Sequence, residues 1–161
     1  MPDAYRNIYK ASRKVAGLTQ EAAAERLSIS VESIRAYETG QRIPHNGLVA
    51  RMAVVYNDLM LGYEHCRSTD DLMARIIPRL HRRSIMEIVV RLFNRIKRLA
   101  TKGSVERLLE MADDGKIDQD EKADFTEIVN DIGELVQVGL ELQLYPAVTE
   151  LDVTESSWND E

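Results

Sequence analysis

The chain has 161 residues, of which 44% are hydrophobic and 30% charged, and its formal net charge is −6. This length allows one or two small domains, and no apolar run approaches the roughly 18 residues of a membrane-spanning helix. A single cysteine, Cys66, excludes an internal disulfide, and the histidines at 45, 65 and 81 lack the spacing of metal ligands. We expect an all-α, cytoplasmic protein that crosses no membrane and uses no metal or cofactor.

The charge is distributed unevenly along the chain. Residues 1–66 carry a net charge of +1, residues 67–102 carry +7, and residues 103–161 carry −14. An acidic protein is a poor ligand for DNA, because DNA binding depends largely on neutralising phosphates. Since the acidic residues are confined to the C-terminal part, the preceding residues remain compatible with a DNA partner.

Residues 4–16 are predicted to form the first helix. Ile8, Ala11 and Val15 have the spacing of an inward-facing apolar stripe. Basic residues surround this stripe, and Arg13 is one of them. The pattern predicts an amphipathic helix with its three apolar residues in the core.

Two short helical patterns follow, joined by a polar turn. Thr19 can cap a helix over residues 20–27, and Ser30 can cap a second helix from Val31 to Thr39. In the second helix Ile34 is the inward residue. A helix-turn-helix of this kind can place one helix in the major groove of DNA, which is ~12 Å wide. The residues expected on the outer side of that helix are Glu32, Ser33, Arg35, Ala36 and Thr39.

At these residues the chain resembles the Cro and lambda-repressor-like (XRE) family of helix-turn-helix transcriptional regulators. The resemblance covers about residues 4–66 and implies a five-helix DNA-binding domain over residues 1–66, in which Arg13 pairs with Glu38. The turn glycine common in the family is Ser28 here, so a non-glycine residue would adopt a left-handed conformation. The matching residues are Arg13, Gly17-Leu18-Thr19-Gln20, Ala24, Ile34, Tyr37-Glu38-Thr39-Gly40 and Pro44.

The resemblance also implies which side chains contact DNA. The residues that would face bases are Val31, Glu32, Arg35 and Ala36. Those that would hold phosphates or base edges are Gln20, Ser30 and Arg42. An arginine can donate twice to guanine, a glutamate can accept from cytosine, and a valine or alanine can contact a thymine methyl. The alternative is that this face is only solvated surface. The residues expected to bind DNA are Gln20, Ser30, Val31, Glu32, Ser33, Arg35, Ala36 and Arg42.

Two further helices, over residues 46–56 and 57–66, would complete the five-helix domain. Residues 67–83 are expected to form a connecting segment. The segment contains Leu72, Ile76 and Leu80, which makes it too apolar for a free linker. We expect it to pack against another part of the chain.

Residues 84–145 are predicted to form an antiparallel helical hairpin. The first apolar stripe runs from Ile85 to Leu99, and its phase slips at Gly103, so the helix either kinks there or restarts with Ser104 as its cap. The second stripe runs from Phe125 to Leu142. The first helix is basic and the second acidic, so their flanks attract. Because a lone hairpin leaves these wide stripes partly wet, we expect a homodimer that closes a four-helix bundle. Residues 146–161 are expected to form an acidic, disordered tail.

The function predicted is that of a sequence-specific DNA-binding transcriptional regulator, a repressor that binds double-stranded DNA as a dimer. The alternative is a protein-interaction module, antitoxin-like or an adaptor, that acts through its acidic C-terminal half. A further hypothesis is that the acidic tail folds back and weakens non-specific DNA binding. Residues 110–121 superficially fit a calcium loop, but Ala112 occupies a ligand position. No nucleophile and base are paired in the sequence, so no enzyme activity is expected.

Overall fold

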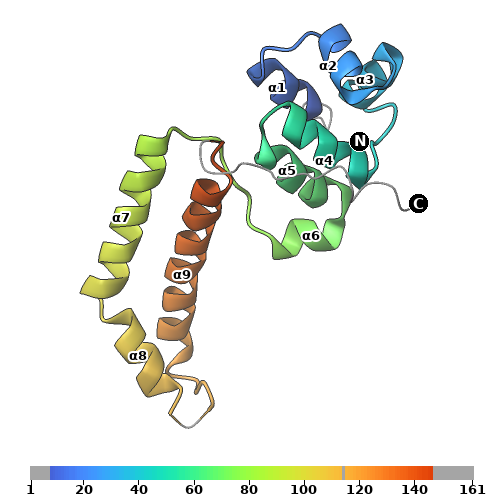
Figure 1. Ribbon diagram of the computed structural model, residues 1–161. Coiled ribbons are helices and arrows are strands. Elements are labelled where there is room, and N and C mark those ends of the chain that lie inside the picture. Colours follow the sequence, from blue (N-terminus) through green and yellow to red (C-terminus); the bar gives the residue numbers. More distant parts are fainter. Residues whose placement is uncertain (1–7, 114, 147–161) are drawn as a thin grey trace. The chain divides into compact units, whose positions relative to one another are not determined.

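The computed structural model describes residues 8–113 and 115–146, and the predicted acidic tail after Pro146 lies outside this range. Nine helices make up the described part of the chain, which contains no strand (Figure 1). The predicted all-α class is therefore confirmed. The helices belong to two compact units, one containing residues 8–78 together with residues 144–146 and the other covering Arg79–Gln143.

The first unit contains six short helices around one apolar core. Tyr9, Leu27, Ile34, Met52 and Leu61 are almost completely buried in that core. Five successive helices each supply one of these side chains, so every helix of the domain except the last is held by the same core. The helices are α1 (Ile8–Val15), α2 (Gln20–Leu27), α3 (Val31–Glu38), α4 (Asn46–Val55), α5 (Leu59–Thr69) and α6 (Asp71–Ile76).

The inward side of α1 differs from the predicted one. Ala11 is exposed and Val15 is 75% exposed, so the predicted apolar stripe is wrong at these two residues, whereas Ile8 is partly buried against the core as predicted. The buried side chains are instead those of Tyr9, Ser12 and Arg13. Each of these reaches a polar partner inside the unit, which removes the cost of burying a polar group. Apolar spacing alone could not reveal this arrangement, because the partners lie far away in the sequence.

The segment after the fifth helix packs against that helix, as predicted. The Tyr63 hydroxyl donates to the Pro78 carbonyl at 2.8 Å, and Arg67 donates to the carbonyls of Ala74 and Ile77 at 3.2 and 3.3 Å. These contacts hold α6 and the residues after it against α5. The fifth helix itself is longer than predicted and ends at Thr69 rather than at Cys66.

The second unit is the predicted helical hairpin, with an additional break. Its helices are α7 (Ile85–Thr101), α8 (Ser104–Met111) and α9 (Lys122–Gln143). Ser84 and Glu87 form a capping box at the start of α7. Gly103, with φ of 58°, separates α7 from α8. The helix therefore restarts, but Gly103 is the cap and Ser104 is the buried first residue of the new helix.

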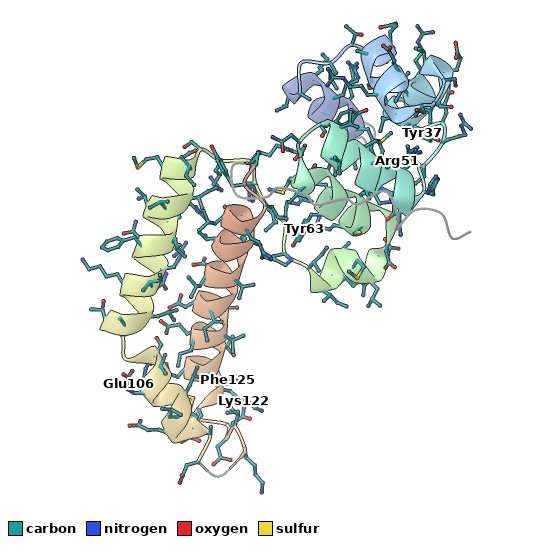
Figure 2. All side chains as sticks on the ribbon, in the orientation of Figure 1. Tyr37, Arg51, Tyr63, Glu106, Lys122 and Phe125 are labelled. Carbon is teal, nitrogen blue, oxygen red and sulfur yellow. The ribbon has the colours of Figure 1, made fainter. Side chains whose placement is uncertain are left out.

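Ion pairs connect α7 with α9, which run side by side in opposite directions (Figure 1). They join Arg95 to Glu134 at 2.7 Å, Arg98 to Asp131 at 3.1 Å, and Lys102 to Glu127. At the far end, α8 approaches the start of α9, where Figure 2 shows Lys122 and Phe125. The predicted attraction between a basic and an acidic helix is confirmed.

The two predicted apolar stripes of the hairpin are only partly buried within the chain. Ile88 is the one fully buried side chain of α7, and Ile128 and Val138 are the buried apolar side chains of α9. Several stripe residues are largely exposed, and Phe93 is 63% exposed. The hairpin thus buries one side of each stripe and leaves the other side uncovered.

Candidate nucleic-acid interface

The turn between α2 and α3 has the geometry that the sequence predicts. The Thr19 hydroxyl accepts a hydrogen bond from the Ala22 amide at 3.1 Å, and the Ser30 hydroxyl accepts one from the Ser33 amide at 3.1 Å. Ser28 ends α2 with φ of 54° and ψ of 44°, the left-handed conformation expected of the residue in place of glycine. Both caps and the turn residue therefore fix the angle at which α3 leaves α2.

Helix α3 inserts Ile34 into the core and exposes part of its opposite side. Glu32 and Arg35 are exposed, while Val31 and Ser33 are half-buried. Ala36 was expected to face outward, but it is only 8% exposed, so that expectation is wrong. With eight residues, α3 turns just over twice, and Ala36 lies on the side where the chain returns, since its carbonyl accepts from the Arg42 amide at 3.2 Å.

A buried ion pair ties α1 to the end of α3. Arg13 Nε and Nη2 donate to the two carboxylate oxygens of Glu38 at 2.5 and 2.9 Å, and Nη1 donates to the Leu18 carbonyl at 2.6 Å. Burial raises the pKa of Glu38, but the hydrogen bonds from Arg13 and Gln20 outweigh it and hold that pKa below its usual value. Glu38 therefore stays ionised, and the pairing expected from the family resemblance is present.

The ion pair continues outward to the exposed side of α3. Gln20 Nε2 donates to Glu38 at 2.9 Å, and Gln20 Oε1 accepts from Arg35 Nε at 3.3 Å. The buried Arg13 is thus connected through Glu38 and Gln20 to an exposed arginine on α3. Sequence reasoning assigned Gln20 to DNA contact alone and did not find its role as a bridge within the domain.

Arg42 lies beside α3, although it follows that helix in the chain. Its Nη2 donates to the Ser33 hydroxyl at 3.1 Å, and its guanidinium carbon lies 5.5 Å from the centre of the Tyr37 ring. The Ser33 hydroxyl is also 3.0 Å from that of Ser30. The structure therefore brings Ser30, Ser33 and Arg42 together, with Tyr37 as a support that sequence reasoning missed. An aromatic residue five positions before an arginine was the only signal.

Other kinds of site have little support in the part of the chain that is described. No group of three or more His, Cys, Asp or Glu side chains among residues 8–113 and 115–146 could hold a metal ion. Glu121, the last residue of the superficial calcium loop, accepts a hydrogen bond from the Asp118 amide at 3.0 Å. None of the helices described is both long and apolar enough to cross a membrane.

Comparison with known protein families gives one match. Residues 10–57 match the model of a helix-turn-helix domain. Comparisons with curated proteins and with solved structures give no match. The matched region extends from within α1 to just beyond α4 and contains the whole α2–α3 motif. Residues 10–57 therefore form a helix-turn-helix domain, which supports a role in binding DNA.

Proposed function

We propose that the protein is a sequence-specific transcriptional regulator of the Cro and lambda-repressor-like kind, which acts in the cytoplasm as a repressor. In this proposal α3 enters the major groove and its outer side chains read the bases. The protein performs no catalysis and binds double-stranded DNA as a homodimer formed through its C-terminal hairpin. Two recognition helices in one dimer would read half-sites separated by one or more helical turns of ~34 Å each.

The observation that carries this proposal is the placement of Arg35. Its side chain is exposed on the outer side of α3, and its Nε donates to Gln20. Because Nε is used in this contact, the two terminal nitrogens can donate together to the O6 and N7 atoms of a guanine. The bridge to the buried Arg13–Glu38 pair holds the guanidinium in position before DNA arrives, which reduces the entropy lost on binding.

The neighbouring side chains suit complementary tasks. Glu32 is exposed one turn before Arg35 and can accept from the amino group of a cytosine, while Val31 can contact a thymine methyl. Arg42, Ser30 and Ser33 form a polar group that can hold a phosphate at the edge of the groove. We exclude Ala36 from the reading set, because its side chain is buried.

The alternative function, binding of a basic protein partner by the acidic C-terminal half, has less support. Four carboxylates of α9 already pair with basic residues of the same hairpin: Asp124, Glu127, Asp131 and Glu134. Charges that are neutralised within the hairpin contribute little to the attraction of another protein. The uncovered feature of the hairpin is instead apolar.

Replacing Arg35 by alanine tests the reading surface. The variant should lose ~1–3 kcal/mol of binding free energy on the preferred duplex and should discriminate less at one base position. The measurement is a fluorescence-anisotropy titration at fixed salt with duplexes that differ at single positions. Arg75→Ala, which removes an exposed arginine from α6, is the matched control and should change neither quantity. Unchanged affinity and unchanged base preference in Arg35→Ala would remove this residue from the reading surface.

A further inference from the structure

The hairpin leaves an apolar stripe uncovered on each of its long helices. Successive residues of the stripe on α7 are three, four and three positions apart, and those of the stripe on α9 are four, three and four positions apart. The exposed fractions are 69% for Met86, 63% for Phe93 and 53% for Ile96, and they are 46% for Val129 and 51% for Val136. A continuous apolar surface of this extent on a folded chain is typical of an interaction site. The stripe of α7 consists of Met86, Val89, Phe93 and Ile96, and that of α9 consists of Val129, Gly133, Val136 and Leu140.

Both stripes lie on the same flank of the hairpin. With about 3.6 residues per turn, the stripe of α7 and the ion-paired Arg98 fall on opposite sides of the buried Ile88. On α9 the stripe and the ion-paired Asp131 likewise fall on opposite sides of Ile128. Since the ion pairs join the two helices on one flank, the two stripes share the other. The hairpin therefore has one charged flank and one apolar flank.

Gly133 leaves open space on the apolar flank of α9. Glycine is among the least favourable residues inside a helix, and its lack of a side chain allows a bulky group of a neighbouring helix to approach closely. A Cβ atom built on Gly133 would meet no atom of the described chain within 4 Å outside the adjoining backbone of its own helix. Contacts within the described part of the chain therefore give no reason for the missing side chain.

We propose that a second copy of the hairpin covers this flank, with α7 of each copy packed against α9 of the other. Charge disfavours the other pairing, because Lys97 is exposed at the edge of the apolar stripe of α7 and would meet its own copy if α7 packed against α7. The corresponding edge of α9 carries the uncharged Asn130 and Gln137. Pairing unlike helices therefore avoids placing like charges opposite each other.

The ion pairs also fix the register of this bundle. As the residue in α7 advances from Arg95 to Arg98, its partner in α9 moves back by the same three positions, from Glu134 to Asp131. A two-fold axis parallel to the helices keeps every residue at its own height and makes unlike helices neighbours across the interface. Ile96 then lies level with Gly133 of the second copy, and Phe93 with Val136. The bulky Ile96 of α7 thus meets the position on α9 that has no side chain.

This arrangement deepens the proposed function. A two-fold axis along the bundle puts the first residues of both α7 helices at the same end. The chain enters α7 from the helix-turn-helix unit, so both such units would be attached at that end, as paired reading of two half-sites requires. The inference rests on the homodimer of the proposed function, but the association of the hairpins is measured without DNA and can therefore succeed or fail separately from DNA reading.

The first test is the mass of the full-length protein in solution without DNA. Sedimentation equilibrium should give twice the mass of the chain at micromolar concentration. Phe93→Glu should weaken dimerisation by about 30-fold or more, as expected for a central aromatic residue of an interface. Asn94→Glu is the control, because Asn94 is exposed on the other side of α7, and it should leave the dimer unchanged. A monomeric wild-type protein, or equal effects of the two substitutions, would overturn the proposal.

A second variant separates interface from fold. Gly133→Gln removes a poor helix former from α9, so the monomeric hairpin should become more resistant to unfolding. The same change should weaken the dimer by about tenfold or more, because the glutamine side chain must compete with Ile96 of the second copy for space. A dimer as strong as that of the wild type would contradict the proposed contact.

Cross-linking tests the pairing of unlike helices. In a Cys66→Ser background, which removes the exposed native thiol, Ala100→Cys and Val129→Cys are prepared as separate proteins. After mixing and subunit exchange, mild oxidation should give a covalent dimer containing one chain of each kind. Efficient cross-linking of Ala100→Cys with itself would indicate that α7 packs on α7, and would refute the arrangement. Arg35→Ala should form the same dimer as the wild type, so a failure of DNA reading is distinguishable from a failure of association.

Discussion

The two units of the molecule differ in how completely each one buries its own apolar side chains. The helix-turn-helix unit buries ten core residues from five helices, and its charged Arg13 and Glu38 are buried with partners. The hairpin has fewer buried apolar side chains, although its helices are longer, and a row of large apolar residues remains exposed.

The buried polar atoms show the same contrast. Within the described residues, six buried side-chain nitrogen or oxygen atoms make no hydrogen bond, and all six belong to residues of the second unit. They lie in Arg83, Arg91, Ser104, Arg107, Glu134 and Glu141. Three of the six nevertheless lie in ion pairs, Arg83 Nε with Glu141 Oε2 and Glu134 Oε2 with Arg95. A natural domain normally satisfies such atoms. The described residues of the first unit therefore satisfy their buried side-chain polar atoms, whereas those of the second leave atoms of Arg91, Ser104 and Arg107 without a partner.

The largest effect is expected from breaking the buried ion pair of the first unit. Arg13→Ala leaves the Glu38 carboxylate buried without its main partner, which should cost ~3–5 kcal/mol of stability. Hydrogen exchange at the amides of α3 and α4 reads this unit separately from the hairpin. The matched change in the hairpin, Glu134→Gln, breaks an ion pair whose members are partly exposed and should cost less than ~1 kcal/mol. Equal losses would contradict the contrast between the units.

Removing apolar volume should give the next largest effect and should distinguish the units by their dependence on protein concentration. Met52 is fully buried in the first unit, so Met52→Ala should cost ~2–5 kcal/mol at every concentration. Ile96→Ala in the hairpin should cost little where the protein is monomeric and more where it is dimeric. Chemical denaturation followed at two concentrations a hundredfold apart measures both. A concentration-independent loss in Ile96→Ala would contradict the role given to the apolar flank.

Sequence patterns predicted the helix-turn-helix accurately because its signals are local. Caps such as Thr19 and Ser30 and the turn at Ser28 act within a few residues, and the structure confirms all three. The inward side of α1 was predicted only in part, because its buried polar side chains pair with residues far along the chain, as Ser12 does with Asp58 at 2.6 Å.

The sequence was sufficient to predict which residues belong to the site, but not the contacts between them. Arg35 and Glu32 are exposed on α3 as predicted, whereas the buried position of Ala36 depends on how the chain returns after Gly40. The bridge from Glu38 through Gln20 to Arg35 joins three helices, counting Arg13 at its inner end. No periodicity within one helix reports such a contact. Likewise, a helical stripe shows which residues are apolar, but not whether one chain suffices to cover them.

Gln20→Ala should have a smaller effect, confined to DNA reading. Without the Gln20 oxygen, Arg35 loses the acceptor that orients it, and binding to the preferred duplex should weaken by ~0.5–1.5 kcal/mol. Discrimination at the base read by Arg35 should fall with it. In the double variant Gln20→Ala/Arg35→Ala, the two effects should be clearly less than additive. Full additivity, measured in the same anisotropy titrations, would show that Gln20 acts independently of Arg35.

Mild acid should weaken the first unit through His65. Burial lowers the pKa of His65 below its ordinary value of 6.5, and the ring lies 2.7 Å from the Tyr9 hydroxyl and 3.0 Å from the Asn46 carboxamide oxygen. Since the folded state prefers the neutral ring, this contribution to stability is complete above pH 6.5 and declines as the pH falls below it. Hydrogen exchange in α1 and α5 at pH 7.5 and 5.5 should show the decline, after correction for the intrinsic exchange rate. The decline should be reduced in His65→Gln, and an undiminished decline would assign it to another group.

The most direct measurement is selection of duplexes from a random library by the purified full-length protein. The account predicts enrichment of one sequence arranged as an inverted repeat, with half-site centres one or more helical turns apart, and loss of a guanine preference in the Arg35→Ala variant. Recovery of sequences with no common motif at physiological salt would contradict the central claim that the outer side of α3 reads DNA.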